Sequence, residues 1–232
     1  MAGGYWRIAS GLLLVPAAVA GLSGCSNGPS TATASMAKAS SDGGLTAAQL
    51  RGALLTRVNG VAAAAPASSG RYSSLTAANT SKNGADAVRV TPKACAAAAG
   101  FNPAALAASP AAAVTFKVGS NEVSEVLIAS SAKTASTALA AHIPAECAKY
   151  EAKVGGKTYT YGATEQKVTG IGQQAKVLNV QAAGVKSNNR WSLIYRGKDF
   201  VGTVTVVGPN ASKEAVTELG RQAYAYAVKT LS

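Results

Sequence analysis

The stretch that decides the fold is Trp191–Arg196 (WSLIYR), the turn Gly197-Lys198-Asp199, and Phe200–Val207 (FVGTVTVV). Two runs rich in apolar, β-branched and aromatic residues, joined by a short turn containing Gly, are typical of a β-hairpin. Gly208-Pro209 ends the second strand. A long helix is then predicted from about Asn210 to Leu231. Its expected buried stripe is Val216, Leu219, Ala223, Tyr226 and Ala227.

Outward from this hairpin the sequence predicts more strands and helices. Strands are predicted at 114–118, 123–129, 157–164 and 175–182. Helices are predicted at 45–58, 131–141 and 144–150, with short helical turns at Pro92 and Pro103. Thr46 and Gln49 form a capping-box pattern at the start of the first helix. Residues 59–91 favour neither helix nor strand clearly.

Consecutive strands joined by short turns favour an antiparallel sheet. The sequence therefore predicts an α+β fold: an antiparallel sheet with helices packed on one face and one disulfide. About 190 residues from position 45 to 232 suit a single domain with a substantial core.

The first 24 residues are typical of a secretory signal peptide. Arg7 is the only charge before an apolar stretch at 11–24, which is shorter than the roughly 20 residues that span a bilayer. Leu22-Ser23-Gly24-Cys25 resembles the bacterial lipobox, in which a cysteine takes a diacylglycerol before cleavage. We therefore expect Cys25 to be the lipid-bearing N-terminus of a protein anchored at the extracytoplasmic face of the cell membrane.

The segment that follows supports tethering. Residues 25–44 consist mostly of Ser, Ala, Thr, Gly, Asn and Pro, a composition that buries too little apolar area to fold. The segment is predicted to be a flexible spacer.

Two cysteines remain after Cys25, and both would lie in an oxidising compartment. We expect Cys95 and Cys147 to form a disulfide, worth roughly 4 kcal/mol in the chain-entropy model. A metal site is disfavoured because two distant cysteines and a single histidine, His142, make a poor ligand set. No C-x-x-C redox motif is present, and no cofactor is expected.

The chain is strongly basic, with a formal net charge of +12, or +11 without the signal peptide because only Arg7 is lost. Such a charge suits anionic lipid headgroups or cell-wall polymers, but it also describes an ordinary solvated surface. Lys and Arg are spread evenly, without the runs typical of a phosphate-binding patch. Together with export, this argues against nucleic acid as a partner.

Short motifs that suggest catalysis all lack their context. Gly156-Lys157-Thr158 lacks the first glycine of a P-loop, and the Gly-rich segment at 170–175 precedes a predicted strand where a dinucleotide site needs a helix. Ser35 and Ser130 each begin an S-x-x-K pattern without the accompanying K-T-G or S-D-N motif.

The remaining candidates for acid–base chemistry are also weak. His142, the only histidine, is expected to cap helix carbonyls or face solvent, and no G-x-S-x-G elbow exists. Glu122 and Glu125 are expected on the exposed surface. We therefore predict no catalytic residue, with a hydrolase of non-standard site as the least favoured alternative.

Aromatic residues gather in the C-terminal half of the chain: Tyr150, Tyr159, Tyr161, Trp191, Tyr195, Tyr224 and Tyr226. They either fill the core with hydroxyls at its rim or line a groove for a glycan or lipid. The speculative ligand-binding set is Tyr159, Tyr161, Trp191 and Tyr195.

The order of segments resembles the extracellular sensor domain of PknH-type bacterial receptor serine/threonine kinases, and related lipoproteins of actinobacteria. The segments that carry this resemblance are Leu54-Leu55-Thr56, Pro92–Cys95, the hairpin with 114–116, Ala138–Ala141 before Glu146-Cys147, and Gly197–Gly208 before a long helix. The resemblance implies an α+β domain with a concave cleft that senses or binds a ligand outside the membrane. Kinase-linked members tend to have a second disulfide, for which this chain has no cysteines.

The leading functional hypothesis is thus a lipid-anchored, non-catalytic binding or sensor domain for a cell-wall glycan, lipid or envelope protein. The alternative is a structural envelope lipoprotein whose basic surface holds anionic cell-wall polymers, in which case binding should collapse with salt.

Overall fold

The computed structural model describes residues 44–75, 89–95, 101, 103–154, 157–185 and 189–232. The predicted signal peptide, Cys25 and all of the spacer except Gly44 lie outside these described residues. Among the helices that the structure describes, none is both long and apolar enough to cross a membrane.

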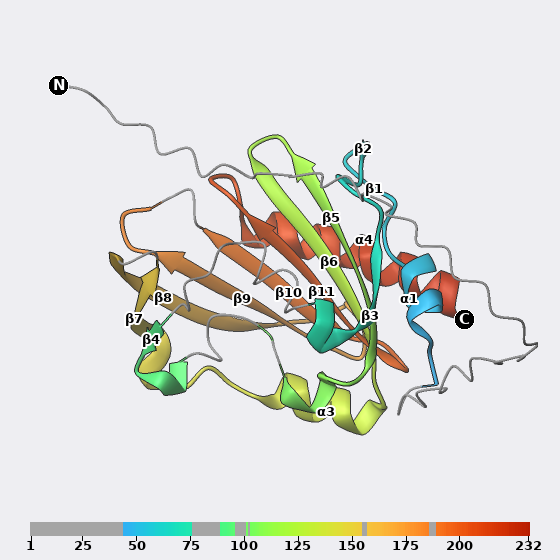
Figure 1. Ribbon diagram of the computed structural model, residues 1–232, viewed down its shortest axis with the longest axis horizontal. Coiled ribbons are helices and arrows are strands. Elements are labelled where there is room, and N and C mark those ends of the chain that lie inside the picture. Colours follow the sequence, from blue (N-terminus) through green and yellow to red (C-terminus); the bar gives the residue numbers. More distant parts are fainter. Residues whose placement is uncertain (1–43, 76–88, 96–100, 102, 155–156, 186–188) are drawn as a thin grey trace, which may run out of the picture. The chain divides into compact units, whose positions relative to one another are not determined.

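One antiparallel sheet organises the described residues (Figure 1). Its strand order is β3-β5-β6-β11-β10-β9-β8-β7-β4. The strands are β3 (Ser68–Arg71), β4 (Arg89–Thr91), β5 (Pro110–Val118), β6 (Asn121–Ala129), β7 (Lys149–Val154), β8 (Lys157–Val168), β9 (Gln174–Ala182), β10 (Arg190–Arg196) and β11 (Phe200–Val207). Both predicted hairpins are confirmed, since β5 pairs with β6 and β10 pairs with β11.

Of the helices that accompany the sheet, five have both ends within the described residues. They are α1 (Ala47–Gly52), α3 (Ala132–Ala140), α4 (Lys213–Leu231), η2 (Ala104–Leu106) and η3 (Ala145–Ala148). The predicted capping box is present, because the Thr46 side chain accepts from the Gln49 amide and Gln49 bonds back to the Thr46 amide. The helices α3 and α4 begin with serine caps at Ser131 and Ser212.

The predicted first helix is too long. Helix α1 ends at Gly52, and a small hairpin of β1 (Arg57–Val58) and β2 (Val61–Ala62) occupies the rest of the segment. Asn59 and Gly60 between them both have positive φ, at 49° and 79°. Asn-Gly is the preferred pair for such a two-residue turn, so this sequence signal outweighed the helical spacing.

Two further predictions are wrong in detail. The helix expected to carry Cys147 and Tyr150 is only η3, and Tyr150 lies on β7, where alternating side chains fit a half-covered strand. On α4, Tyr226 is exposed, whereas the rest of the predicted stripe is buried.

Helices cover both faces of the sheet, whereas the sequence placed them on one. We call the side under α1 and α4 the helix face, and the side under α3, η2, η3 and the disulfide the disulfide face. Leu193 and Tyr195 point into the helix-face core, and Ile194 between them points into the core under α3. Because successive strand residues point to opposite faces, three buried apolar neighbours require cover on both sides. The α+β class and the antiparallel sheet are confirmed.

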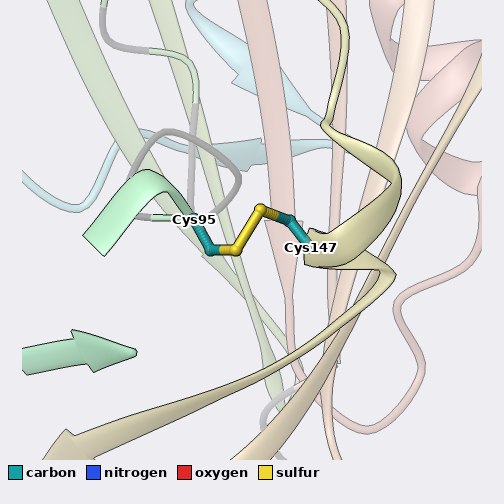
Figure 2. The surroundings of a disulfide bond; sticks show 2 residues. All are labelled: Cys95 and Cys147. Carbon is teal, nitrogen blue, oxygen red and sulfur yellow. A yellow bond between two sulfur atoms is a disulfide. The ribbon is translucent and has the colours of Figure 1, made fainter. Parts of the chain in front are cut away.

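The predicted disulfide is also confirmed. Cys95 and Cys147 are joined, with their Cα atoms 5.3 Å apart, and both are fully buried (Figure 2). The bond connects the short helical turn after Pro92 to η3. It centres a small core on the disulfide face that includes Tyr150, Ala152 and Val180.

Candidate functional site

The four aromatic residues singled out from the sequence do not gather at one place. Tyr159 and Tyr161 lie on the disulfide face and are partly exposed. Tyr195 lies on the helix face and is fully buried, in edge-to-face contact with Phe200 and Tyr224. Trp191 packs partly buried against that same helix-face core. The two faces of the sheet therefore separate the set: Tyr159 and Tyr161 lie together on one face, and the buried Tyr195 is closed to ligand contact.

The disulfide face instead brings Tyr161 to residues that the sequence did not single out for binding. The rings of Tyr161 and Tyr150 are stacked, with centroids 5.5 Å apart and planes inclined by 14°. Arg190, at the start of β10, lies within electrostatic reach of Tyr150 and of Tyr72. We refer to Tyr72, Tyr150, Tyr161 and Arg190 as the tyrosine–arginine cluster.

Strand register explains why these residues meet. Tyr150 on β7 pairs with Tyr161 on β8, and Arg190 on β10 pairs with Val180 on β9. All of these side chains point to the disulfide face, because residues paired across an antiparallel ladder share a face. Tyr72 follows β3, and its hydroxyl donates to the carbonyl of Phe101.

Burial has the largest effect on the electrostatics of the cluster. Burial raises the pKa of Tyr150, the neighbouring Tyr161 raises it further, and the positive charge of Arg190 opposes both effects. Burial likewise raises the pKa of Tyr72 against the same opposing charge. Burial lowers the pKa of Arg190, while the two tyrosines act in the other direction. At neutral pH the cluster therefore consists of neutral phenols and one guanidinium, with Tyr72 and Tyr150 buried and Tyr161 partly exposed.

The neighbouring part of this face is polar as well. Ser192 and Thr205 lie side by side on β10 and β11, and their hydroxyls are 2.9 Å apart. Both residues are buried. A guanidinium binds carboxylate or phosphate, and aromatic faces stack on sugar rings, so the cluster has the chemistry of a site for an acidic ring-containing ligand.

A second polar group on the same face joins the loop after α3 to the sheet. Nδ1 of His142 bonds Oε1 of Glu165, and Nζ of Lys176 lies 3.3 Å from Oε2 of the same carboxylate. Nζ of Lys176 also donates to the carbonyl of Ala141. His142 therefore faces solvent as predicted, but the carbonyl at the helix end is capped by Lys176 instead.

The carboxylate of Glu165 is stabilised by these two partners. Burial alone would raise the pKa of Glu165, but the bonds and charges of His142 and Lys176 outweigh it and hold the pKa below its usual value. No nucleophile contacts the group in the bonds that the structure describes. These bonds hold the loop before η3 against β8 and β9.

Glu125 corrects another sequence prediction. It was expected on the surface, yet it is 1 % exposed on the helix face, and its Oε2 accepts from the amide of Leu55 at 2.8 Å. Burial raises its pKa to about 7 against the opposing effect of that bond. The residues just after α1 cover the carboxyl, so substrate does not reach it, and a hydrolase gains no support.

Among the described residues there is no group of three or more His, Cys, Asp or Glu side chains placed to hold a metal ion. The sequence indicated the tyrosine–arginine cluster only through its tyrosines: Tyr159 and Tyr161, which alternate on one predicted strand, and Tyr150 shortly before them. Arg190 and Tyr72 join it through register between distant segments, which a single sequence does not reveal.

Comparison with known proteins gives matches among solved structures. The chain is similar to the extracellular domain of PknH from Mycobacterium tuberculosis, with 13% identity over 62% of this chain and 77% of that one, and a TM-score of 0.45. It is also similar to an uncharacterized protein from Mycobacterium smegmatis, a Rv0999 ortholog, with 16% identity over 63% and 77% of the chains and a TM-score of 0.36. No family model matches the sequence, and no curated protein matches it.

Proposed function

We propose that this chain is an exported, lipid-anchored, non-catalytic binding protein, and that the tyrosine–arginine cluster of its disulfide face binds an acidic, ring-containing envelope ligand. The observation that carries the proposal is Arg190 within electrostatic reach of Tyr72 and Tyr150 on that face, where Tyr161 stacks on Tyr150. The anchor is Cys25, supported by the lipobox pattern around it.

Two physical arguments support this ligand class. Placing a guanidinium among aromatic rings lowers the local dielectric, so an incoming carboxylate or phosphate is bound more strongly than at a hydrated lysine. Tyr161 of the cluster and Tyr159, two residues before it on β8, are partly exposed, and they offer the faces on which a sugar ring stacks.

The binding proposal is tested with residues 26–232, which contain the disulfide and every core residue that the structure describes. The probe is a preparation of soluble peptidoglycan fragments, whose sugar rings carry carboxylates, titrated by calorimetry. Tyr161→Ala is expected to weaken binding by tenfold or more. Tyr226→Ala, which removes an exposed tyrosine from α4, is the matched control and should bind as the parent does. Equal loss in both variants, or no binding by the parent, would reject the proposal.

The anchor is tested separately in cells. Cys25→Ala should leave a protein that is uncleaved or released, while its domain keeps the same melting temperature. Recovery of that variant as an acylated membrane protein would overturn the anchor, whatever the binding experiment shows.

A further inference from the structure

The outer part of the sheet has one face that no described helix covers. Strands β8, β7 and β4 form what we call the wing, and their side chains alternate strictly between two environments. On the disulfide face, the wing contributes Val90, Tyr150, Ala152 and Ala163 to the core around the disulfide. Helix α4 packs on β9, β10 and β11 and reaches β8 near its end, where Lys213 donates to Gln166. The opposite face of β4, β7 and residues 157–164 of β8 has no cover from a described helix.

Along β4, β7 and residues 157–164 of β8, every side chain on that open face is polar, whereas Val168 at the far end of β8 packs against the helix-face core. Register places the following residues there: Arg89, Thr91, Lys149, Glu151, Lys153, Thr158, Thr160 and Thr164. All are exposed except Thr160, which is partly exposed. Alternation alone explains the polarity of a solvent-facing strand, but it does not explain the arrangement of the charges.

Positive side chains are neighbours on this face. Arg89 and Lys153 are directly paired across β4 and β7, where like charges destabilise a sheet. Lys149 lies on the same face of β7, and Glu151 is the one acid among the residues given above. The ion pairs that the structure describes join other residues. Three cations are thus kept together on one face at some cost in stability.

We propose that the open face of the wing is a docking surface for the anionic lipid headgroups of the membrane to which the chain is tethered. Charge complementarity selects an anionic partner, and an open strand face with short threonine side chains matches a planar surface. The proposed anchor, on which this inference rests, supplies the proximity. The predicted spacer has 20 residues, and a flexible chain of that length would have a root-mean-square length of about 25 Å, which would keep the domain within reach of the bilayer.

The test uses residues 26–232, so that neither the lipid nor the signal peptide contributes to binding. The probe is vesicles of phosphatidylcholine with 30% phosphatidylglycerol, compared with pure phosphatidylcholine, in a sedimentation assay. Each cation near an anionic surface contributes about fivefold to partitioning. We therefore expect the triple variant R89Q/K149Q/K153Q to partition about a hundredfold less, and E151Q to partition about fivefold more.

A matched triple variant separates local from general electrostatics. K117Q/K198Q/K229Q removes the same net charge from exposed sites outside the wing and should partition nearly as the parent does. Equal loss in both triples would overturn the docking surface, as would equal binding to neutral vesicles. Binding to soluble polyphosphate with none to vesicles would also overturn it, in favour of a cell-wall polymer. None of these results touches the proposed ligand site, because the Tyr161 variant keeps the wing charges intact.

Discussion

The central strands and the wing are built from the same chain in two different ways. Strands β10 and β11 are covered on both faces, and their sequence is a nearly continuous apolar run with buried residues at successive positions. In strand β7 and residues 157–164 of β8, described core residues lie only on the disulfide face, and they alternate with Lys, Glu and Thr that are exposed or partly exposed. The pattern of each strand therefore records how many of its faces are covered.

This difference assigns stability and recognition to different parts of the sheet. The central strands bury large side chains such as Leu193 and Ile194 against helices on both sides. The wing has a small core, closed by the Cys95–Cys147 bond, and it presents the partly exposed tyrosines on one face and the cations on the other. A small core with exposed polar faces is typical of a part of the molecule that binds rather than one that stabilises.

The largest expected effect comes from removing the disulfide. In C95A/C147A, loss of a bond that links residues 52 positions apart should lower the free energy of unfolding by about 4 kcal/mol. Hydrogen exchange should show the loss first in amides of β7 and β8, because the bond closes their core. In the comparison variant Leu193→Ala, both parts should lose protection. A uniform loss across the sheet in C95A/C147A would mean that the wing is not a separate unit.

The next effect concerns the buried acid of the central part. The pKa of Glu125 is raised to about 7 in the folded protein. The buried carboxyl therefore costs the folded state least below pH 4.5, and it lowers the free energy of unfolding increasingly as the pH rises towards 7. Glu125→Gln removes this dependence. It should match the parent at pH 4.5 and exceed it in unfolding free energy by up to about 3 kcal/mol at pH 8. Denaturant titrations at the two pH values measure the difference.

Glu122→Gln is the control for that titration. Glu122 is exposed on the same strand and should change stability little at either pH. If Glu125→Gln were less stable than the parent at pH 8, the carboxyl would be ionised and held by contacts other than the amide of Leu55.

A third effect tests how tightly α4 packs on β10. A Cβ at Gly220 would clash with the Leu193 side chain, so Gly220→Ala should cost about 2 kcal/mol despite the better helix propensity of Ala. Gly52→Ala at the end of α1 meets no atom within 4 Å and should be neutral or stabilising. Melting temperatures of the two variants provide the measurement, and similar values would contradict the tight central packing.

The smallest effect belongs to the open face of the wing. Lys153→Gln relieves the direct pairing with Arg89 and should raise the unfolding free energy by roughly 0.5 kcal/mol. The same substitution should weaken binding to anionic vesicles. A variant that lost stability would show that the two cations are not in conflict in the folded protein.

Much of this architecture could be predicted from local patterns in the sequence. The hairpin over 190–207, the capping box at Thr46 and the terminal helix all depend on residues close together in the chain. The Asn59-Gly60 turn was a local signal as well, but the helical spacing of Leu50, Leu54 and Val58 masked it. The disulfide followed from counting cysteines, without any knowledge of the fold.

The candidate site could not be predicted in the same way. Tyr72 and Arg190 lie far apart in sequence and meet Tyr150 only because nine strands pair in one particular order. The burial of Glu125 likewise depends on the chain just after α1 crossing β6, a contact between residues 70 positions apart. Patterns within a strand determine which face a side chain takes, but not what lies opposite it.

The claim that the partly exposed tyrosines on the disulfide face of the wing bind the ligand is tested most directly by the NMR signals of the tyrosine rings. Residues 26–232 labelled with ¹³C in their tyrosine rings would be titrated with soluble peptidoglycan fragments, and the ring shifts followed by NMR. We predict that the signals of Tyr159 and Tyr161 move in a saturable way, while those of Tyr195 and Tyr224 in the helix-face core stay fixed. Movement of the core tyrosines with unchanged signals from Tyr159 and Tyr161 would contradict the proposed site.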